Sequence, residues 1–223
     1  MFDRPIAHRG LHDRANGVIE NSASAFERAV QHNFAIECDL QLTSDGEVVV
    51  FHDDDLDRLT GLSGRIAGID SKTLCASPLL GSAAKDCPQR FADFLAQIGG
   101  RTLLQIELKR QLGPATETLA RKAAVTIAGY RGPVAFESFD PQQIILIRKF
   151  GFDGQRGIIT YAYDNPAWDA GLSEAERKSL RTLDHAAETQ FDYISCFQKD
   201  VGMPTIRSLA SPGQAGHGVD DPI

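Results

Sequence analysis

The sequence alternates short apolar segments of strand length with stretches of helical periodicity, and this alternation restricts the fold more than any other feature. Segments typical of strands lie at residues 5–8, 34–42, 47–52, 102–108, 134–139, 156–160 and 192–197. Helical spacing or helix-initiating residues occur at residues 24–32, 89–98, 115–130, 141–150, 173–188 and 204–209. Strands that alternate with helices form a largely parallel sheet covered by those helices, so we predict an α/β fold.

The positions of the polar residues favour one of two versions of this fold. A closed (β/α)8 barrel and an open doubly wound sheet both satisfy the alternation. Polar pairs gather toward the C-terminal ends of four strand segments, at His8-Arg9, Glu37-x-Asp39, His52-Asp53 and Glu107-x-Lys109. Because barrel enzymes carry their sites on that rim, we predict a (β/α)8 TIM barrel that forms a single domain over residues 1–223.

Two regions depart from the alternation. Residues 53–88 are interrupted by glycines, and we interpret them as a small insertion after the third strand. Residues 211–223 are rich in glycine, proline and aspartate, which favours an irregular tail and a missing or divergent C-terminal strand. The chain of 223 residues is also about 27 residues shorter than a typical barrel of ~250.

Composition excludes several classes of protein. A net charge of −7 does not suit a general nucleic-acid binder, and no apolar run approaches the ~18 residues of a membrane span. The four cysteines are scattered without a CxxC pair, so neither a disulfide scaffold nor a zinc site is expected. We therefore expect reduced thiols and a cytoplasmic location.

Two strand segments carry charged residues at alternate positions. Glu37 and Asp39 point to one face of their strand, and Glu107 and Lys109 repeat this arrangement on another. If both faces meet, three carboxylates lie close enough to require a cation or a proton between them. Oxygen ligands without thiolates favour Mg²⁺ or Ca²⁺. The alternative is that these acids lie in solvent on the outside of their strands.

Three further residues suit phosphate chemistry. His8 and His52 each end an apolar segment, and histidine is the side chain best suited to proton transfer near neutral pH. Arg9 offers a fork of donors for a phosphate or a carboxylate. The alternatives are structural roles for the histidines and a surface ion pair for Arg9.

The ordered set of these strings resembles the glycerophosphodiester phosphodiesterase family. It comprises IAHRG at 6–10, ENSASAF at 20–26, IECDLQLTSDG at 36–46, VVFHDDDLDRLT at 49–60, LQIELK at 104–109, SFD at 138–140 and DYI at 192–194. The resemblance runs from residue 4 to about residue 200. One departure is the absence of a final strand with a WTV-like string.

The resemblance implies a barrel enzyme whose substrates are small molecules. It would hydrolyse glycerophosphodiesters to glycerol 3-phosphate and an alcohol. The resemblance assigns site residues by position: His8 and His52 as catalytic residues, Arg9 and Lys109 as phosphate-binding residues, and Glu37, Asp39 and Glu107 as ligands of a divalent metal, Mg²⁺ or Ca²⁺. Two alternatives are a lysophospholipase D-like phosphodiesterase and a truncated barrel that binds phosphate ligands without turnover. The sequence leaves the oligomeric state open.

Overall fold

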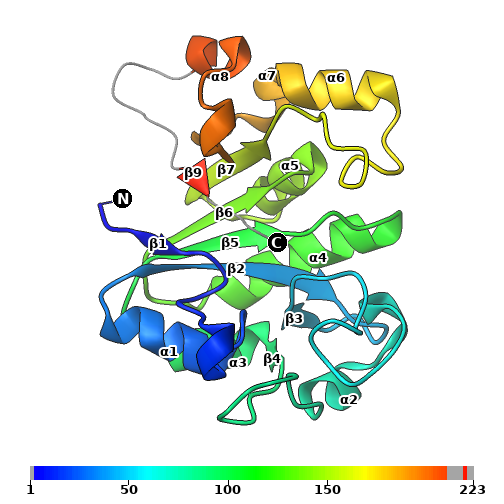
Figure 1. The fold of residues 1–223 in the computed structure, drawn as a ribbon. Helices are drawn as coiled ribbons and strands as arrows, with labels where there is room; N and C mark the ends of the chain where they lie inside the picture. The colour runs from blue at the N-terminus through cyan, green and yellow to red at the C-terminus, as the bar shows by residue number, and fades with distance from the viewer. Residues whose placement is uncertain (1–2, 210–217, 220–223) are drawn as a thin grey trace.

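The computed structural model describes residues 3–209 and 218–219, which form one strongly curved sheet with helices along its outer side (Figure 1). The strands are β1 (Ile6–Ala7), β2 (Ala35–Leu42), β3 (Val48–Val50), β4 (Gln89–Arg90), β5 (Leu104–Leu108), β6 (Val134–Ser138), β7 (Gln155–Thr160), β8 (Tyr193–Phe197) and β9 (Gly218–Val219). The helices are α1 (Ala23–Gln31), α2 (Ser71–Cys75), α3 (Phe91–Ile98), α4 (Pro114–Ile127), α5 (Pro141–Lys149), α6 (Glu174–Thr182), α7 (Ala186–Thr189) and α8 (Pro204–Leu209).

The curved wall of the sheet is parallel throughout. Its strands follow the order β1-β2-β5-β6-β7-β8-β9, and every neighbouring pair in this order is parallel. The connections after β1, β5, β6, β7 and β8 each contain a helix. The α/β fold of barrel type expected from the sequence is thereby confirmed.

The alternation within β2 explains how this wall positions polar groups. All eight residues of β2 are buried, and α1 and α4 cover its outer face. Ile36, Cys38 and Leu40 belong to the main hydrophobic core, whereas Glu37 and Asp39 occupy the alternate positions. Since side chains alternate between the faces of a strand, the carboxylates point to the inner side of the wall. The alternative of solvent-facing acids is therefore wrong.

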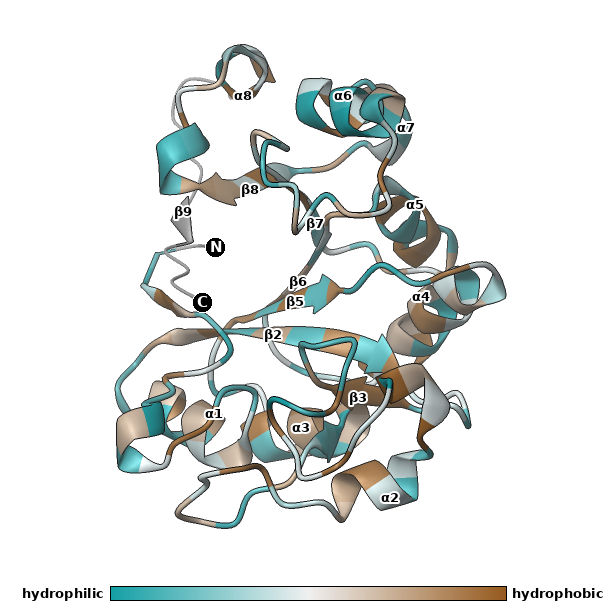
Figure 2. Ribbon diagram, turned by 45° about the vertical axis from the view of Figure 1, so that its right-hand side comes forward, coloured by the Kyte–Doolittle hydropathy of each residue, from teal (hydrophilic) through white to brown (hydrophobic). Residues whose placement is uncertain are grey.

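The helices begin where side-chain caps are available. Ser22 caps α1, where its hydroxyl accepts a hydrogen bond from Ala25 N–H at 3.2 Å, so this helix begins one residue before the predicted range of 24–32. Asp140 caps α5 directly before Pro141, as its sequence indicates. Figure 2 shows hydrophobic residues along β3, β8 and α5, whereas α6 is mostly hydrophilic.

The third predicted strand does not belong to the parallel wall. β3 pairs antiparallel with the end of β2, with Leu40 opposite Val50, and β4 pairs antiparallel with β3. The short turn after β2 leaves no room for a crossover helix, so a hairpin forms instead. Residues 53–88, which follow β3, contribute α2 and pack against residues before them in a small hydrophobic core. This core comprises Ile19, Val49, Phe51, Leu56, Leu59, Ile66, Leu74 and Leu79.

The end of the chain contributes a last, very short wall strand. Within the predicted irregular tail, the structure describes only Gly218 and Val219, which form β9 parallel to β8. The prediction of an irregular tail is wrong for these two residues, and its other residues lie outside the described part of the chain. Among the described residues, no pairing joins β9 to β1.

Candidate active site

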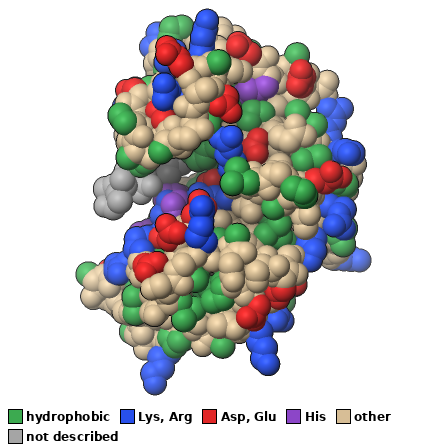
Figure 3. Space-filling view, turned by 90° about the vertical axis from the view of Figure 1, so that its right-hand side faces the viewer, with side chains coloured by type: hydrophobic (Ala, Val, Ile, Leu, Met, Phe, Trp, Pro, Cys, Tyr) green, Lys and Arg blue, Asp and Glu red, His purple; other side chains and the backbone are tan. Residues whose placement is uncertain are grey.

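The predicted site residues converge on one cleft at the C-terminal rim of the wall. The cleft has a volume of about 1180 Å³, and Figure 3 shows the hollow in which histidine, acidic and basic side chains meet. The predicted residues that line it are His8, Arg9, Glu37, His52, Glu107 and Lys109. Asp39 is fully buried behind them.

Three buried carboxylates lie together because β2 and β5 are neighbours. Asp39 pairs with Glu107 in the register of these strands, and Glu37 lies two residues earlier on β2. Glu37, Asp39 and Glu107 each offer a carboxylate oxygen, and these oxygens all lie within 4.8 Å of one another. We call this group the carboxylate cluster.

Lys109 lies against the carboxylate cluster. Its Nζ is 3.2 Å from Asp39 Oδ1 and 3.2 Å from Glu107 Oε1. Burial alone would lower the pKa of this ammonium, but the charges of the two carboxylates outweigh burial and raise it. Lys109 therefore carries a positive charge at neutral pH.

Lys109 does not balance the whole negative charge of the cluster. Burial, together with the charges of Asp39 and Glu107, raises the pKa of Glu37 well above its usual value. Burial would also raise the pKa of Asp39, but the charges of Lys109, His52 and Arg9 lower it strongly. Glu107 has a raised pKa because of burial and the nearby Asp39 charge. The cluster thus retains unfavourable repulsion between acidic groups.

The three carboxylates of the cluster are suitable ligands for a hard divalent cation. Asp39 Oδ1 is buried and accepts no hydrogen bond from the described residues, although Lys109 forms an ion pair with it. An additional positive charge among the three carboxylates would relieve the repulsion that raises the pKa of Glu37. The all-oxygen donor set suits Mg²⁺ or Ca²⁺.

Arg9 is held beside the carboxylate cluster by its backbone and its side chain. Its backbone N–H donates to Glu37 Oε2 at 2.8 Å, and its φ of 53° is left-handed, a conformation that non-glycine residues adopt mainly where surrounding contacts impose it. The guanidinium pairs with Glu20 at 3.0 Å and lies 3.7 Å from Asp39. His8 precedes it, with Nε2 3.8 Å from Glu37 Oε2.

His52 is positioned by a network that the sequence analysis did not assign. Its Nδ1 lies 2.7 Å from Asp53 Oδ1, and Arg58 joins Asp53 to Glu20 through contacts of 2.6 Å. Gln41 of β2 donates to the backbone carbonyls of residues 51–53, which fixes the segment that carries His52. The sequence indicated this network only in that its residues lie within the segments that resemble the glycerophosphodiester phosphodiesterase family.

Glu137 is a further buried acid that the sequence analysis missed. It lies opposite Glu107 in the register of β5 and β6, lines the cleft, and is 2% exposed. Ser195 Oγ donates to its Oε2 at 2.6 Å, and Gln105 also donates to this oxygen. Burial outweighs these hydrogen bonds and raises its pKa to about 7.

The raised pKa of Glu137 predicts a pH-dependent effect of Glu137→Gln on stability. Between pH 4.5 and 7 the folded state holds a proton that the unfolded state has lost, so this group lowers stability as the pH rises. We expect Glu137→Gln to stabilise the protein by up to about 3 kcal/mol at pH 8 and by little at pH 4.5. Urea unfolding at both values measures this, and an equal effect at both would contradict it.

Comparison with known families identifies the chain. The model of the glycerophosphoryl diester phosphodiesterase family matches residues 8–150, which is more than half of the sequence, so the chain belongs to this family. A glycerophosphodiester phosphodiesterase of Caldanaerobacter subterraneus is 50% identical over 60 residues, which are 26% of this chain and 24% of that protein. A protein of Bacillus subtilis matches to the same extent, so each alignment spans about a quarter of the relative's length.

Solved structures share the fold at low sequence identity. A phosphodiesterase from Oleispira antarctica in complex with the product sn-glycerol-3-phosphate has a TM-score of 0.74 and 19% identity, over 92% of this chain and 79% of that chain. A glycerophosphodiester phosphodiesterase from Agrobacterium tumefaciens has a TM-score of 0.65 and 21% identity, over 92% of this chain and 80% of that chain.

No helix in the described part of this chain is long and apolar enough to cross a membrane.

Proposed function

We propose that this protein hydrolyses glycerophosphodiesters to glycerol 3-phosphate and an alcohol, with a divalent cation held by Glu37, Asp39 and Glu107. The observation that carries the proposal is the buried carboxylate cluster with Lys109 against it, beside a cleft that His8 and His52 also line. Membership of the family supports the reaction type, and the ligand of the Oleispira antarctica structure matches the proposed product.

The charges around the cleft suit a phosphodiester. Its oxygens are negative and repel a nucleophile, and a bound Mg²⁺ or Ca²⁺ would supply Lewis-acid stabilisation of the phosphoryl group. Arg9 and Lys109 add two positive charges that offset the negative charge building up in the transition state. The proposed function thus assigns phosphate binding to these two residues.

His8 and His52 supply the proton transfers in this proposal. One takes a proton from the water or substrate hydroxyl that attacks phosphorus, and the other gives a proton to the alcohol oxygen whose bond to phosphorus breaks. Where a substrate hydroxyl attacks, water then opens the cyclic phosphate to give glycerol 3-phosphate. Asp53, at 2.7 Å from His52 Nδ1, orients that imidazole. Arg58 in turn holds Asp53 and Glu20 in place.

The product of glycerophosphocholine hydrolysis tests the proposed function. We expect the purified protein with Mg²⁺ or Ca²⁺ to release glycerol 3-phosphate and choline, measured by separate coupled assays for the two products. Release of choline phosphate and glycerol would place the cleavage on the other side of phosphorus. Binding of glycerol 3-phosphate without hydrolysis of any glycerophosphodiester would support the truncated, ligand-binding alternative instead.

A further inference from the structure

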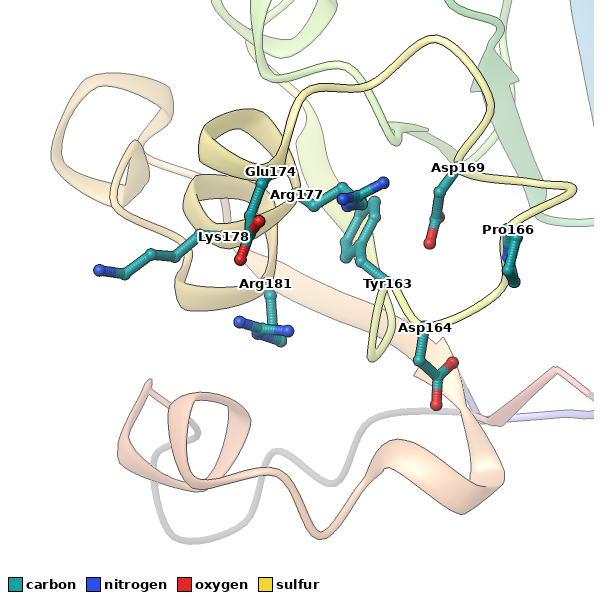
Figure 4. Close-up of a pocket in the computed structure, with 8 residues that line it drawn as sticks. All are labelled: Tyr163, Asp164, Pro166, Asp169, Glu174, Arg177, Lys178 and Arg181. Atoms are coloured by element: carbon teal, nitrogen blue, oxygen red, sulfur yellow. The ribbon is translucent and has the colours of Figure 1, made fainter.

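A second, smaller cavity lies between α6 and the loop that joins β7 to α6. It has a volume of about 350 Å³, and Figure 4 shows polar and charged side chains around it. Sites for small molecules enclose about 300–1,000 Å³, so this cavity has the size of a site for a small ligand. The proposed mechanism uses no residue that lines it. We call this cavity the α6 cavity.

One face of α6 carries basic side chains into the lining of the α6 cavity. Arg177, Lys178 and Arg181 all line it, and with Glu174 they occupy positions i, i+3, i+4 and i+7, which share one face of a helix. The head groups of the three basic residues form no ion pair or hydrogen bond with any other described residue. Arg177 and Arg181, one turn apart, therefore repel each other without an ion-pair partner.

The acidic side chains around the α6 cavity do not form a cation site. The Tyr161 hydroxyl donates to the carboxylate of Asp169, which is 3% exposed, and Asp164 Oδ1 lies 4.0 Å from Lys199 Nζ. In the described part of the chain, the groups of acidic and histidine side chains that are close enough to hold a metal ion lie elsewhere. With these two carboxylates set aside, three positive charges and one negative charge, that of Glu174, line the cavity.

Tyr163 adds a buried polar group that lacks a partner. It lines the α6 cavity and is 6% exposed, and its hydroxyl has no hydrogen-bond partner among the described residues. Figure 4 shows that Arg177 extends from α6 toward Tyr163, whereas Lys178 extends away from it. A buried hydroxyl without a hydrogen bond is unfavourable. An anion held by Arg177 would bring an acceptor oxygen toward this hydroxyl.

We propose that the α6 cavity binds a phosphate group, either as the free ion or as a small phosphate monoester such as glycerol 3-phosphate. Guanidinium groups bind oxyanions through pairs of parallel N–H donors, and Arg177 and Arg181 supply two such groups on one helix face. A doubly charged phosphate offsets more of the positive charge than a singly charged carboxylate does. Arg9 and Lys109 do not line this cavity, so the proposal does not depend on the proposed function.

The α6 cavity and the catalytic cleft share part of their lining. Tyr163 lines both, and its ring stacks on Tyr161, which lines the cleft, with 4.0 Å between the centroids. A signal from the loop that carries these residues would therefore not tell the two cavities apart. The test must instead read individual arginines.

Calorimetric titration tests whether a phosphate group binds. The protein is freed of divalent cations by chelation and dialysis, and is titrated at pH 8 and low ionic strength with inorganic phosphate, glycerol 3-phosphate and acetate. We expect saturable binding of both phosphates and much weaker binding of acetate, which carries a single charge. Equal affinities would support the free ion as the ligand, and tighter binding of glycerol 3-phosphate would support the organic phosphate. No saturable binding of either phosphate, or equally tight binding of acetate, would overturn the proposal.

Substitutions on α6 test where the phosphate binds. The double variant Arg177→Gln/Arg181→Gln should bind inorganic phosphate at least ~tenfold more weakly, because it loses both sets of charged donors. Glutamine keeps a high helix propensity, so α6 should remain folded. Arg121→Gln, at an exposed position on α4 that lines neither cavity, should bind phosphate as the wild type does. An unchanged affinity of the double variant would count decisively against the α6 cavity.

Modification of arginines by phenylglyoxal locates the phosphate in the wild-type protein, with each peptide read by mass spectrometry. At a phosphate concentration ten times the Kd, modification of Arg177 and Arg181 should slow by about tenfold. Arg121 should react at the same rate with and without phosphate. Protection confined to Arg9 and Arg58, which line the cleft, would place the phosphate there and overturn the proposal.

Discussion

Alanine at His8 or at His52 is expected to lower kcat for glycerophosphocholine by at least ~10²-fold, because each replacement removes one of the two proposed proton transfers. His52 is held by Asp53 at 2.7 Å, and His8 lies 3.8 Å from Glu37, so neither substitution removes a packed core side chain. Steady-state kinetics with saturating substrate and cation measure the loss. The double variant should lose much less than the product of the two single losses, because the residues act as one unit.

His32→Ala provides the matched control for these variants. His32 is exposed and ends α1, away from the residues that line the cleft. We expect its kcat to equal that of the wild type. An unchanged kcat in His8→Ala or His52→Ala would remove that histidine from the mechanism.

Glu37→Gln is expected to cause the largest loss of activity, roughly 10³-fold, because the stabilisation that a bound cation supplies is worth several kcal/mol. Glutamine keeps the size of the side chain and an oxygen that can accept from Arg9 N–H, but it removes one charge from the carboxylate cluster. The substitution should therefore weaken cation binding without creating a cavity.

The same substitution should have the opposite effect on stability when no divalent cation is present. Burial and the charges of Asp39 and Glu107 disfavour ionised Glu37, so at neutral pH its removal should raise the Tm of the protein in chelator. Added Mg²⁺ or Ca²⁺ should raise the Tm of the wild type and have little effect on the variant. Glu117→Gln, at an exposed position on α4, serves as the control. A lower Tm of Glu37→Gln in chelator would contradict this electrostatic account.

Much of the fold followed from the sequence because local signals and burial agree. The wall strands β2, β5, β6, β7 and β8 lie within one to two residues of the predicted segments, since each is an apolar run that helices cover. The direction of β3 could not be read from its residues, because an apolar run looks the same in a parallel and an antiparallel pair. The short connection after β2 carried the only signal for a hairpin.

The site was predictable to the extent that it depends on strand alternation. The residue pairs Glu37-Asp39 and Glu107-Lys109 each share one face of a strand, and only the register of β2 with β5 brings the two pairs together. Sequence spacing cannot supply that register. A role for Glu137 was not predicted, because a single acidic residue in an otherwise apolar strand forms no spacing pattern with other charged residues.

The networks around the site depend on contacts between distant segments. Arg58 lies 38 residues from Glu20, and Ser195 lies 58 residues from Glu137. The aromatic side chains that line the cleft likewise come from three strand ends and a loop. Such contacts depend on the curvature of the sheet, and local sequence patterns do not predict that curvature.

The dependence of hydrolysis on the carboxylate cluster and its cation is the central claim, and a single assay tests it most directly. Wild type and Glu37→Gln are each assayed for glycerol 3-phosphate release from glycerophosphocholine before chelation, after chelation, and after Mg²⁺ or Ca²⁺ is restored. We predict that the wild type loses its activity in chelator and regains it with the cation, while the activity of the variant is roughly 10³-fold below that of the wild type before chelation and after the cation is restored. Full activity of the wild type in chelator, or wild-type activity in Glu37→Gln, would contradict the account.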